Sequence, residues 1–457
     1  MRLYYALIAL ALISCNSNPV LFETLSADET GVSFSNTVIQ SGDNNVLKYP
    51  YYFNGGGVAV ADFNNDQLPD IYFTGNTVPN KLYLNEGDFR FKDISESAGV
   101  TVTEGWKTGV TVADVNADGW LDLYVCRSAM DDSIKRKNLL FINNHDLTFS
   151  EQASKYGIDD NSYSTGAAFF DYDKDGDLDL FVLNHSLPRY AGFNRLLTSF
   201  KNQKATKFQS KLYRNDQGVF HDVSESAGII NNVLSFGLGL AVSDVNGDSW
   251  PDIYVSNDFN EEDYLFINNQ DGSFTNQVRS ATGHVSLFSM GSDIADINND
   301  ERPDIFTLDM LPESNERIKL SSGDDNYDKY RLLVNSGFHH QSMRNMLQLN
   351  NGDGTFSEIG QLAGISNSDW SWSTFFADFD GDGFKDLYIG NGYEKDYTNM
   401  QFLKYTVDAR IKANQTGVQP TVDEIIDNMP SIHVGNFLFK NNGDLTFTKA
   451  NDSWGMD

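Results

Sequence analysis

The chain has 457 residues, with 64 Asp and Glu against 33 Lys and Arg, and a net charge of −31. The phosphate backbone would repel so acidic a surface, which excludes nucleic-acid binding, while 40% hydrophobic and 13% aromatic residues exclude a disordered chain. Because charged residues are only 21% of the total, the acidity reflects few Lys and Arg beside many Asp, and this indicates bound cations.

The first residues are typical of a secretion signal. Arg2 precedes an apolar run, residues 3–13, which has the length of a signal-peptide core and is too short to span a bilayer. The run ends in Leu-Ile-Ser-Cys, which resembles the bacterial lipobox. By this resemblance residues 1–14 are a lipoprotein signal peptide and Cys15 carries a lipid that anchors the protein to a membrane. The alternative is an ordinary secreted protein in which Cys15 is incidental.

Cys126 is the only other cysteine, which excludes a disulfide framework in the mature chain. It stands within an apolar run, and we expect it to be a small buried core residue.

Six copies of one repeat fill the rest of the sequence. Each copy has a small or apolar run, an acidic loop, a D-[IL]-[YF] run, a run that ends in Asn, and a run around an aromatic residue. Four strand-like runs punctuated by Gly, Asn and Asp predict an all-β protein, a β-propeller of four-stranded blades. Residues 15–457 are therefore expected to form a single domain, with insertions near 186–210, 310–341 and 392–433, the last of them helical in pattern.

The acidic loops are the candidate metal sites. Counted from the first Asp of each loop, positions 1, 3, 5 and 9 carry Asp or Asn in all six copies. We number the loops in chain order: loop 1 has Asp62, Asn64, Asp66 and Asp70; loop 2 has Asp114, Asn116, Asp118 and Asp122; loop 3 has Asp171, Asp173, Asp175 and Asp179; loop 4 has Asp244, Asn246, Asp248 and Asp252; loop 5 has Asp296, Asn298, Asp300 and Asp304; loop 6 has Asp378, Asp380, Asp382 and Asp386.

These side chains can converge on one point, with the carbonyl at position 7 as a further ligand, and oxygen ligands in a flexible loop suit Ca²⁺. Up to six Ca²⁺ are predicted, which would bring the net charge from −31 to −19. Asp and Asn are also good turn formers, but six loops with one spacing favour the metal.

Position 6 divides the loops into two groups. Loops 2, 3 and 6 have Gly119, Gly176 and Gly383 there, whereas loops 1, 4 and 5 have Gln67, Ser249 and Glu301. A left-handed turn is less favourable without glycine, so weaker sites are expected in loops 1, 4 and 5.

The units resemble FG-GAP, or VCBS, repeats of the integrin α-subunit propeller type. The segments NGGGVAVADFNND, NKLYLNEG, LDMLPE and DWSWSTFFADFDGDG are similar to those of VCBS-repeat lipoproteins of the Bacteroidota, related to the cartilage acidic protein family. This resemblance implies a seven-bladed calcium-binding propeller, lipid-anchored in the bacterial cell envelope at the outer membrane, on its periplasmic side or at the surface. It implies no particular reaction.

One segment departs from this pattern. Residues 21–37 resemble only the fourth strand of a unit, so six complete blades and an orphan N-terminal strand are expected. Either six blades close the ring alone, or the propeller is incomplete and has an open edge that invites pairing with another chain. The chain is also expected to lack the C-terminal ASPIC/UnbV-type domain of the similar proteins.

Three other features have alternative interpretations. Trp370 and Trp372 suit packing between blades better than stacking on a sugar. His339 and His340 are candidates for a general base or metal ligand. The segment 186–215 has no Asp or Glu and carries Arg189, Arg195, Lys201, Lys204, Lys207, Lys211 and Arg214. It is either a site for an anionic glycan or acidic partner, or a solvated loop that balances acidic neighbours.

Two function classes follow. The first is a calcium-binding, envelope-anchored module that binds a protein or a glycan. The second is a propeller-fold polysaccharide lyase or hydrolase acting on an anionic glycan, with His339, His340 and the cationic segment as the candidate machinery. No nucleophile elbow, zinc motif or phosphate loop is visible, so we predict the binding module and no catalytic residue.

Overall fold

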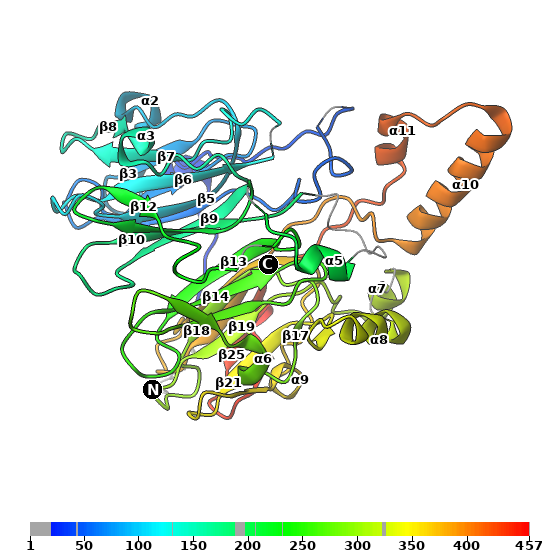
Figure 1. The fold of residues 1–457 in the computed structure, drawn as a ribbon. Helices are drawn as coiled ribbons and strands as arrows, with labels where there is room; N and C mark the ends of the chain where they lie inside the picture. The colour runs from blue at the N-terminus through cyan, green and yellow to red at the C-terminus, as the bar shows by residue number, and fades with distance from the viewer. Residues whose placement is uncertain are drawn as a thin grey trace, which may run out of the picture.

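The computed structural model describes residues 20–42, 44–129, 131–187, 197–205, 207–230, 232–321 and 326–456. The predicted signal peptide, Cys15 and part of the cationic segment lie outside these residues. Within them the chain forms six four-stranded antiparallel sheets, which confirms the predicted propeller of four-stranded blades (Figure 1).

The blades follow the sequence order of the repeats. Blade 1 is β1 (Val58–Ala61), β2 (Asp70–Phe73), β3 (Lys81–Asn85) and β4 (Phe91–Asp93); blade 2 is β5 (Trp106–Ala113), β6 (Asp122–Ser128), β7 (Leu139–Asn143) and β8 (Phe149–Glu151); blade 3 is β9 (Ser164–Phe170), β10 (Asp179–Asn184), β11 (Lys211–Asn215) and β12 (Phe220–Asp222). Blade 4 is β13 (Gly237–Ser243), β14 (Asp252–Asn257), β15 (Tyr264–Asn268) and β16 (Phe274–Asn276); blade 5 is β18 (Ser292–Ala295), β19 (Asp304–Thr307), β21 (Met346–Asn350) and β22 (Phe356–Glu358); blade 6 is β23 (Ser371–Ala377), β24 (Asp386–Asn391), β25 (Phe437–Asn441) and β26 (Phe447–Lys449).

Short helices follow most outer strands. They are α2 (Ser95–Ala98), α3 (Ala153–Tyr156), α6 (Val278–Ala281), α9 (Gly360–Ala363) and α12 (Asn451–Trp454), and the similar α1 (Ala27–Thr30) precedes blade 1. The sequence reading did not predict these single turns, which are too short to show helical periodicity.

The insertions all leave the ring on one face. The three predicted insertions lie between the second and third strands of blades 3, 5 and 6, whereas the acidic loops join the first and second strands. In an antiparallel blade these two connections lie at opposite ends of the strands, so the acidic loops and the insertions occupy opposite faces of the ring. We call these the acidic face and the insertion face.

The insertion face carries the remaining elements. They are α5 (Leu197–Lys201), α7 (Asn315–Leu320), α8 (Tyr327–Asn335), α10 (Met400–Thr416) and α11 (Val422–Asp427), with a two-stranded parallel pair of β17 (Val285–Ser286) and β20 (Gln341–Ser342). Figure 1 shows the helices to the right of the blades, with α10 projecting farthest. The helical pattern predicted in the third insertion is thereby confirmed. No helix in the described part of the chain is long and apolar enough to span a bilayer.

Apolar packing between neighbouring blades holds the ring together. The cluster between blades 1 and 2, for example, joins Ala59 and Tyr72 to Leu123 and Val125. Cys126 lies in β6 with its side chain fully buried and free of any disulfide, as predicted.

Blades 6 and 1 do not meet in this way. On β1, Val58 and Val60 point away from blade 2 and are 57% and 63% exposed, whereas Val110 and Val112, at the same repeat positions of blade 2, are half-buried. On β23, Phe375 is 46% exposed. The two blades therefore leave apolar surface uncovered where they face each other.

The N-terminal segment spans this opening. The backbone N–H of Phe22 donates to the carbonyl of Trp454 in blade 6 (2.8 Å), and its ring contacts Phe379. Farther along, Phe34 stacks on Phe73 of blade 1, with ring centroids 4.8 Å apart. Residues 20–37 thus connect the two ends of the blade array, although apart from α1 they have no regular secondary structure.

Candidate functional site

All six acidic loops have the same backbone conformation. Positions 4 and 6 are left-handed in each loop, and at position 6 this holds for Gln67 (φ 72°), Ser249 (φ 70°) and Glu301 (φ 67°) as well as for the three glycines. Loops 1, 4 and 5 therefore adopt a conformation that disfavours their side chains, which is the physical basis of the weaker sites predicted there.

Backbone N–H groups orient the carboxylates. In every loop the Asp at position 1 accepts from the N–H of position 5 at 3.0–3.2 Å and from that of position 6 at 2.6–3.1 Å. The Asp at position 5 accepts from the N–H of position 7. These bonds fix the turn and the direction of the side chains before any ion is bound.

The Asp at position 9 bonds to two separate segments of its blade. One of its oxygens accepts from the N–H of position 2 at 2.9–3.1 Å, and the other accepts from the N–H of the Asn that ends the third strand at 2.8–2.9 Å. Burial raises the pKa of these carboxyls, to about 7 in Asp179 and to about 6 in Asp122. Position 9 thus ties the acidic loop to the third strand of its own blade.

Loop 3 fits a cation best. Asp171, Asp173 and Asp179 each offer an oxygen within 4.8 Å of the others. The Oδ1 atom of Asp173 is buried and has no hydrogen-bond partner among the described residues. Burial and the neighbouring carboxylates raise the pKa of Asp173, because three negative charges in so small a space are costly without a cation.

Loop 6 also brings three carboxylates together, but a lysine lies among them. Asp378, Asp380 and Asp382 offer oxygens within 4.8 Å of one another. The Nζ atom of Lys440, from β25, donates to Asp380 and, at 2.8 Å, to Asp382. An ammonium group at this position would compete with any metal ion for the same oxygens.

The lysine belongs to a pattern in the repeats. Loops 3 and 6 alone have Asp at position 3, and their blades alone have a cationic residue before the final Asn of the third strand, Arg214 and Lys440. Arg214 pairs with Asp216 at 2.8 Å but also acts electrostatically on Asp173. The extra carboxylate and the extra cation therefore occur together, which the sequence alone could have revealed.

The other four loops are held by side-chain bonds at position 5. In each, the amide of the position-3 Asn donates to the position-5 carboxylate at 2.8–3.1 Å. That carboxylate also accepts from His145 in loop 2, Gln270 in loop 4 and Arg302 in loop 5. Among the described residues, three carboxylates therefore lie within 4.8 Å of one another only in loops 3 and 6, and there without Asp175 and Asp386. Metal binding by any of the six loops stays a prediction.

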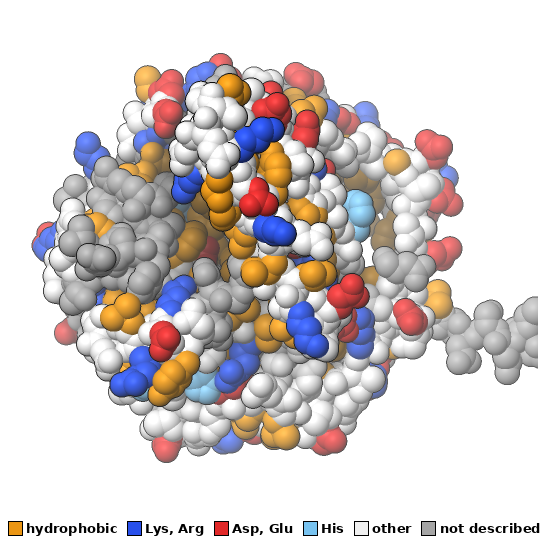
Figure 2. All heavy atoms as spheres, turned by 90° about the vertical axis from the view of Figure 1, so that its right-hand side faces the viewer, with side chains coloured by type: hydrophobic (Ala, Val, Ile, Leu, Met, Phe, Trp, Pro, Cys, Tyr) orange, Lys and Arg blue, Asp and Glu red, His pale blue; other side chains and the backbone are white. Residues whose placement is uncertain are grey.

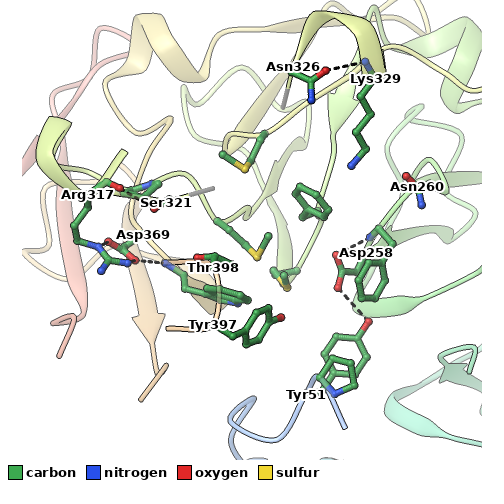
Figure 3. Close-up of a pocket in the computed structure, with 18 of the residues that line it drawn as sticks. Tyr51, Asp258, Asn260, Arg317, Ser321, Asn326, Lys329, Asp369, Tyr397 and Thr398 are labelled. Atoms are coloured by element: carbon green, nitrogen blue, oxygen red, sulfur yellow. Dashed lines mark hydrogen bonds and ion pairs between the residues drawn. The ribbon is translucent and has the colours of Figure 1, made fainter. Parts of the chain in front are cut away.

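The insertion face contains a large cavity. It has a volume of about 560 Å³ and is formed by the segment before β1, the connection after β14, the insertions of blades 5 and 6, and the start of β23. Figure 2 shows this face, with hydrophobic side chains around a central hollow and charged side chains at its rim. Figure 3 shows Tyr51, Asp258, Arg317, Lys329 and Tyr397 around the cavity. Trp370 also lines it.

The two tryptophans line this cavity. Trp370 stacks on Tyr393, with ring centroids 3.8 Å apart, and Trp372 donates from its indole N–H to the carbonyl of Gly392. The predicted packing role is correct, but these partners come from the insertion of their own blade rather than from a neighbouring blade.

The two histidines proposed for the lyase or hydrolase alternative do not form a catalytic site in the described part of the chain. His339 is buried, where desolvation lowers its pKa, and its ring nitrogen lies 3.4 Å from the Thr282 hydroxyl. His340 is exposed and bonds to the Tyr330 hydroxyl at 2.6 Å. Neither histidine lines the large cavity.

Three lysines of the cationic segment are paired with carboxylates. Lys201 pairs with Glu262 at 2.5 Å, Lys204 with Glu225 at 2.8 Å, and Lys211 with Asp160 at 2.9 Å. This arrangement favours the interpretation of a loop that balances acidic neighbours. Arg189 and Arg195 lie outside the described residues.

Sequence reasoning missed most of the cavity. Asp258 and Tyr51 stand in connections without repeat character, and Lys329 belongs to an insertion present in only one copy. No spacing within the repeats points to these residues, so only their meeting in space reveals them.

Six four-stranded blades, each with one acidic loop of fixed spacing, define this protein as a β-propeller built from acidic-loop repeats. The family model described as FG-GAP-like repeat matches residues 62–125, 129–182, 244–307 and 331–389, just over half of the chain. The chain belongs to the FG-GAP-like repeat family.

Curated relatives agree with this assignment. The chain is 29% identical over 245 residues to cartilage acidic protein 1 of Xenopus tropicalis, covering 53% of this chain and 35% of that protein. It is 27% identical over 206 residues to the human protein of the same name, covering 45% of this chain and 28% of that protein. The chain thus matches about a third or less of the length of these homologues.

Solved structures are similar at low identity. A lectin of Agrocybe aegerita, described as recognising non-reducing terminal N-acetylglucosamine, aligns over 86% of this chain and 78% of its own with 16% identity and a TM-score of 0.42. The Vibrio cholerae biofilm matrix protein Bap1 aligns over 66% of this chain and 38% of its own with 12% identity and a TM-score of 0.34.

Proposed function

We propose that this protein is a calcium-stabilised binding module of the bacterial cell envelope, which binds a protein or glycan ligand on its insertion face. The observation that carries the proposal is the cavity of about 560 Å³, which lies within the size range of small-ligand sites. It is built where the insertions of blades 5 and 6 leave the ring, away from the acidic loops. The ring fixes the ends of each insertion and so holds the cavity in shape.

In this proposal calcium has a structural role, which is to stabilise the fold. Loop 3 would hold it through Asp171, Asp173, Asp175 and Asp179, where the partnerless Oδ1 atom of Asp173 is a suitable ligand. Loop 6 would bind more weakly because Lys440 occupies its carboxylates. Extracellular Ca²⁺ sites have dissociation constants of roughly 0.1–1 mM, so each site would stabilise the fold by about 1–2 kcal/mol at a few millimolar Ca²⁺.

Thermal unfolding of the full chain in chelator, in Ca²⁺ and in Mg²⁺, with bound metal counted, tests the calcium part. A Ca²⁺-specific rise in the midpoint is expected, and Asp173→Asn should remove part of it. Glu225→Gln, which changes an exposed carboxylate paired only with Lys204, is the matched control. If Ca²⁺ neither binds nor shifts the midpoint, the acidic loops are turns held by their own hydrogen bonds.

The envelope location rests on the apolar run before Cys15 and on the lipobox-like Leu-Ile-Ser-Cys. Expression in a bacterial host with a labelled fatty acid should label the protein, and Cys15→Ser should abolish the label and release the chain from the membrane fraction. A Cys15→Ser chain that remains in the membrane would contradict lipid anchoring.

The segment before blade 1 occupies the place of an outer strand and helix from a seventh blade. Four glycines after the outer strands, three of which cap short helices while Gly228 ends a turn, lie against the carbonyl of the first outer-strand Phe of the next blade: Gly99 against Phe149, Gly157 against Phe220, Gly228 against Phe274 and Gly364 against Phe447. Gly455 of blade 6 lies against the Phe22 carbonyl in the same way, and Gly31 against that of Phe91. The segment thus continues the series at both of its ends, which supports an incomplete seven-bladed ring.

Glycine substitutions test this arrangement. An added Cβ atom would lie 2.6 Å from the neighbouring carbonyl oxygen at Gly455 and 2.7 Å from it at Gly228. At Gly157 the same distance would be 3.7 Å, an ordinary contact. All three have positive φ, so Ala costs about 1 kcal/mol at each for backbone conformation. The close carbonyl adds a steric cost at Gly455 and Gly228, so Gly455→Ala and Gly228→Ala should both cost more than Gly157→Ala. If Gly455→Ala costs no more than Gly157→Ala, Phe22 does not occupy the outer-strand place.

A further inference from the structure

We propose that the lipid anchor holds this protein with the acidic-loop end of blades 6 and 1 toward the membrane, and with the insertion face and its cavity toward the aqueous side. The partner of the insertion face then arrives from the aqueous side and is not a headgroup of the membrane that holds the chain. This inference rests on the lipid anchoring in the proposed function and specifies which surface is presented to a partner. Three features carry it: the place where the chain enters the fold, the length of the tether and the height of a blade.

The chain enters the fold at the acidic face. The ring of Phe22 contacts that of Phe379, at position 2 of loop 6, with centroids 5.6 Å apart. The Phe22 N–H donates to the carbonyl of Trp454, whose ring lies 5.9 Å from the Lys440 ammonium. Lys440 itself bonds to the carboxylates of loop 6. Two separate contacts thus place Phe22, and Val20 just before it, beside this loop.

From there the chain runs toward the insertion face and is fixed to the blades. Phe34 stacks on Phe73, which ends β2 and therefore lies at the opposite end of blade 1 from loop 1. Tyr51 then lines the cavity of the insertion face. Because these contacts hold the segment after Phe22 in place, that segment does not lengthen the tether, and only the residues before Val20 separate the fold from the anchor.

This tether is short. Cys15 precedes Val20 by five residues in the sequence. Five residues span at most about 18 Å, whatever their conformation. The membrane surface that holds the lipid on Cys15 must therefore pass within about 18 Å of Val20, at the acidic end of blades 6 and 1.

The insertion face is farther away than the tether reaches. Trp370, which lines the cavity, and Asp378, at position 1 of loop 6, stand at the two ends of β23. The seven residues of β23 separate the two faces by about 23 Å, at about 3.3 Å per residue. The helices α8 and α10 lie beyond the ends of the blades (Figure 1) and add about 10 Å, the diameter of a helix. The membrane that holds Cys15 therefore cannot lie against the insertion face.

Energy transfer from the protein to the membrane tests this orientation. The lipidated full chain is reconstituted in phosphatidylcholine vesicles that carry an acceptor dye on a headgroup. The lipid occupies Cys15 and Cys126 is buried, so an introduced cysteine is the reactive thiol for the donor dye. Lys385→Cys, at position 8 of loop 6, reports on the acidic face, and Gln415→Cys, on α10, reports on the insertion face; both side chains are exposed. The Lys385→Cys probe should lie closer to the headgroups by about 20 Å, close to the height of a blade.

A longer tether is the matched control. Twenty Gly and Ser residues inserted between Asn18 and Pro19 give a flexible linker with a mean reach of about 25–30 Å, which lets either face approach the membrane. The difference between the two probes should then shrink. With the native tether, equal transfer from both probes, or stronger transfer from Gln415→Cys, overturns the proposal. A difference that survives the longer tether unchanged shows that the tether does not set the orientation, which also overturns it.

The failure of this proposal is distinguishable from that of the proposed function. A chain that takes up no labelled fatty acid contradicts the anchoring itself, and the orientation fails with it. A chain that takes up the label but brings its α10 probe nearest the headgroups keeps the anchoring and overturns the orientation alone.

Discussion

The Asn that ends the third strand of each blade gives the sharpest test of how the blades are joined. Asn143 of blade 2 donates from Nδ2 to the Phe63 carbonyl of blade 1 at 2.8 Å and to the Leu121 carbonyl of its own blade at 3.2 Å. Its Oδ1 accepts from the His145 N–H. The change Asn143→Ala removes all three bonds and leaves the Phe63 carbonyl buried without its donor.

Two equivalent residues serve as controls. Asn215 of blade 3 is just as buried, but within the described part of the chain its Nδ2 donates only to the Leu178 carbonyl of its own blade. There, Asn85 of blade 1 likewise donates only to the Pro69 carbonyl. A buried polar group that loses its partner costs about 1–3 kcal/mol. Asn143→Ala should therefore lower the free energy of unfolding by about 1–3 kcal/mol more than Asn215→Ala, and Asn85→Ala should cost least because it is partly exposed.

Urea unfolding at a fixed Ca²⁺ concentration, followed by tryptophan fluorescence, measures the three changes on one scale. If Asn143→Ala is no more destabilising than Asn215→Ala, hydrogen bonding between blades does not contribute to the stability of the ring. The apolar clusters alone would then account for the contact between blades 1 and 2.

Three further outcomes are expected. Lys440→Met removes the ammonium group from loop 6 and should raise the Ca²⁺ affinity of that loop; an unchanged calcium titration would show that the lysine does not compete. Val60→Asp, at the opening between blades 6 and 1, should cost less than about 0.5 kcal/mol, whereas Val112→Asp at the same repeat position in a closed interface should cost several kcal/mol; equal costs would mean that the opening is covered. Burial raises the pKa of Asp263 to about 7. Its contribution to the free energy of unfolding is therefore full below about pH 4 and declines as the pH rises toward 7. Asp263→Asn should flatten that part of the pH profile of stability, measured by urea unfolding. A profile with the same slope in both proteins would contradict this pKa.

The repeats made most of the fold predictable. The D-[IL]-[YF] runs and the Asn-ended runs became the second and third strands, because each repeats the same alternation of buried and exposed positions six times. The common turn of the acidic loops was readable for the same reason. The repeats could not predict whether blades 6 and 1 pack against each other, because the surface that Val60 faces differs from the surface at the same position in the other five units.

The candidate sites were predictable to different extents. The four positions of each acidic loop are fixed by spacing, and the Lys440 cation stands at a repeat position where comparison of the six units would have exposed it. The cavity depends on contacts between connections that occur once each, such as the meeting of Tyr51 with Asp258 across 207 residues of sequence. No periodicity encodes such a contact.

The separation of the two faces has a consequence for how such a protein can change. Every insertion leaves from the connection between a second and a third strand, where added residues shift neither the pairing within a blade nor the turn of an acidic loop. The insertion face can therefore diverge by lengthening, shortening or exchanging a few connections, while the half of the molecule that carries the acidic loops is inherited unchanged. Replacing residues 392–436 with the matching connection of another member of the family would alter one wall of the cavity and leave the frame as it is.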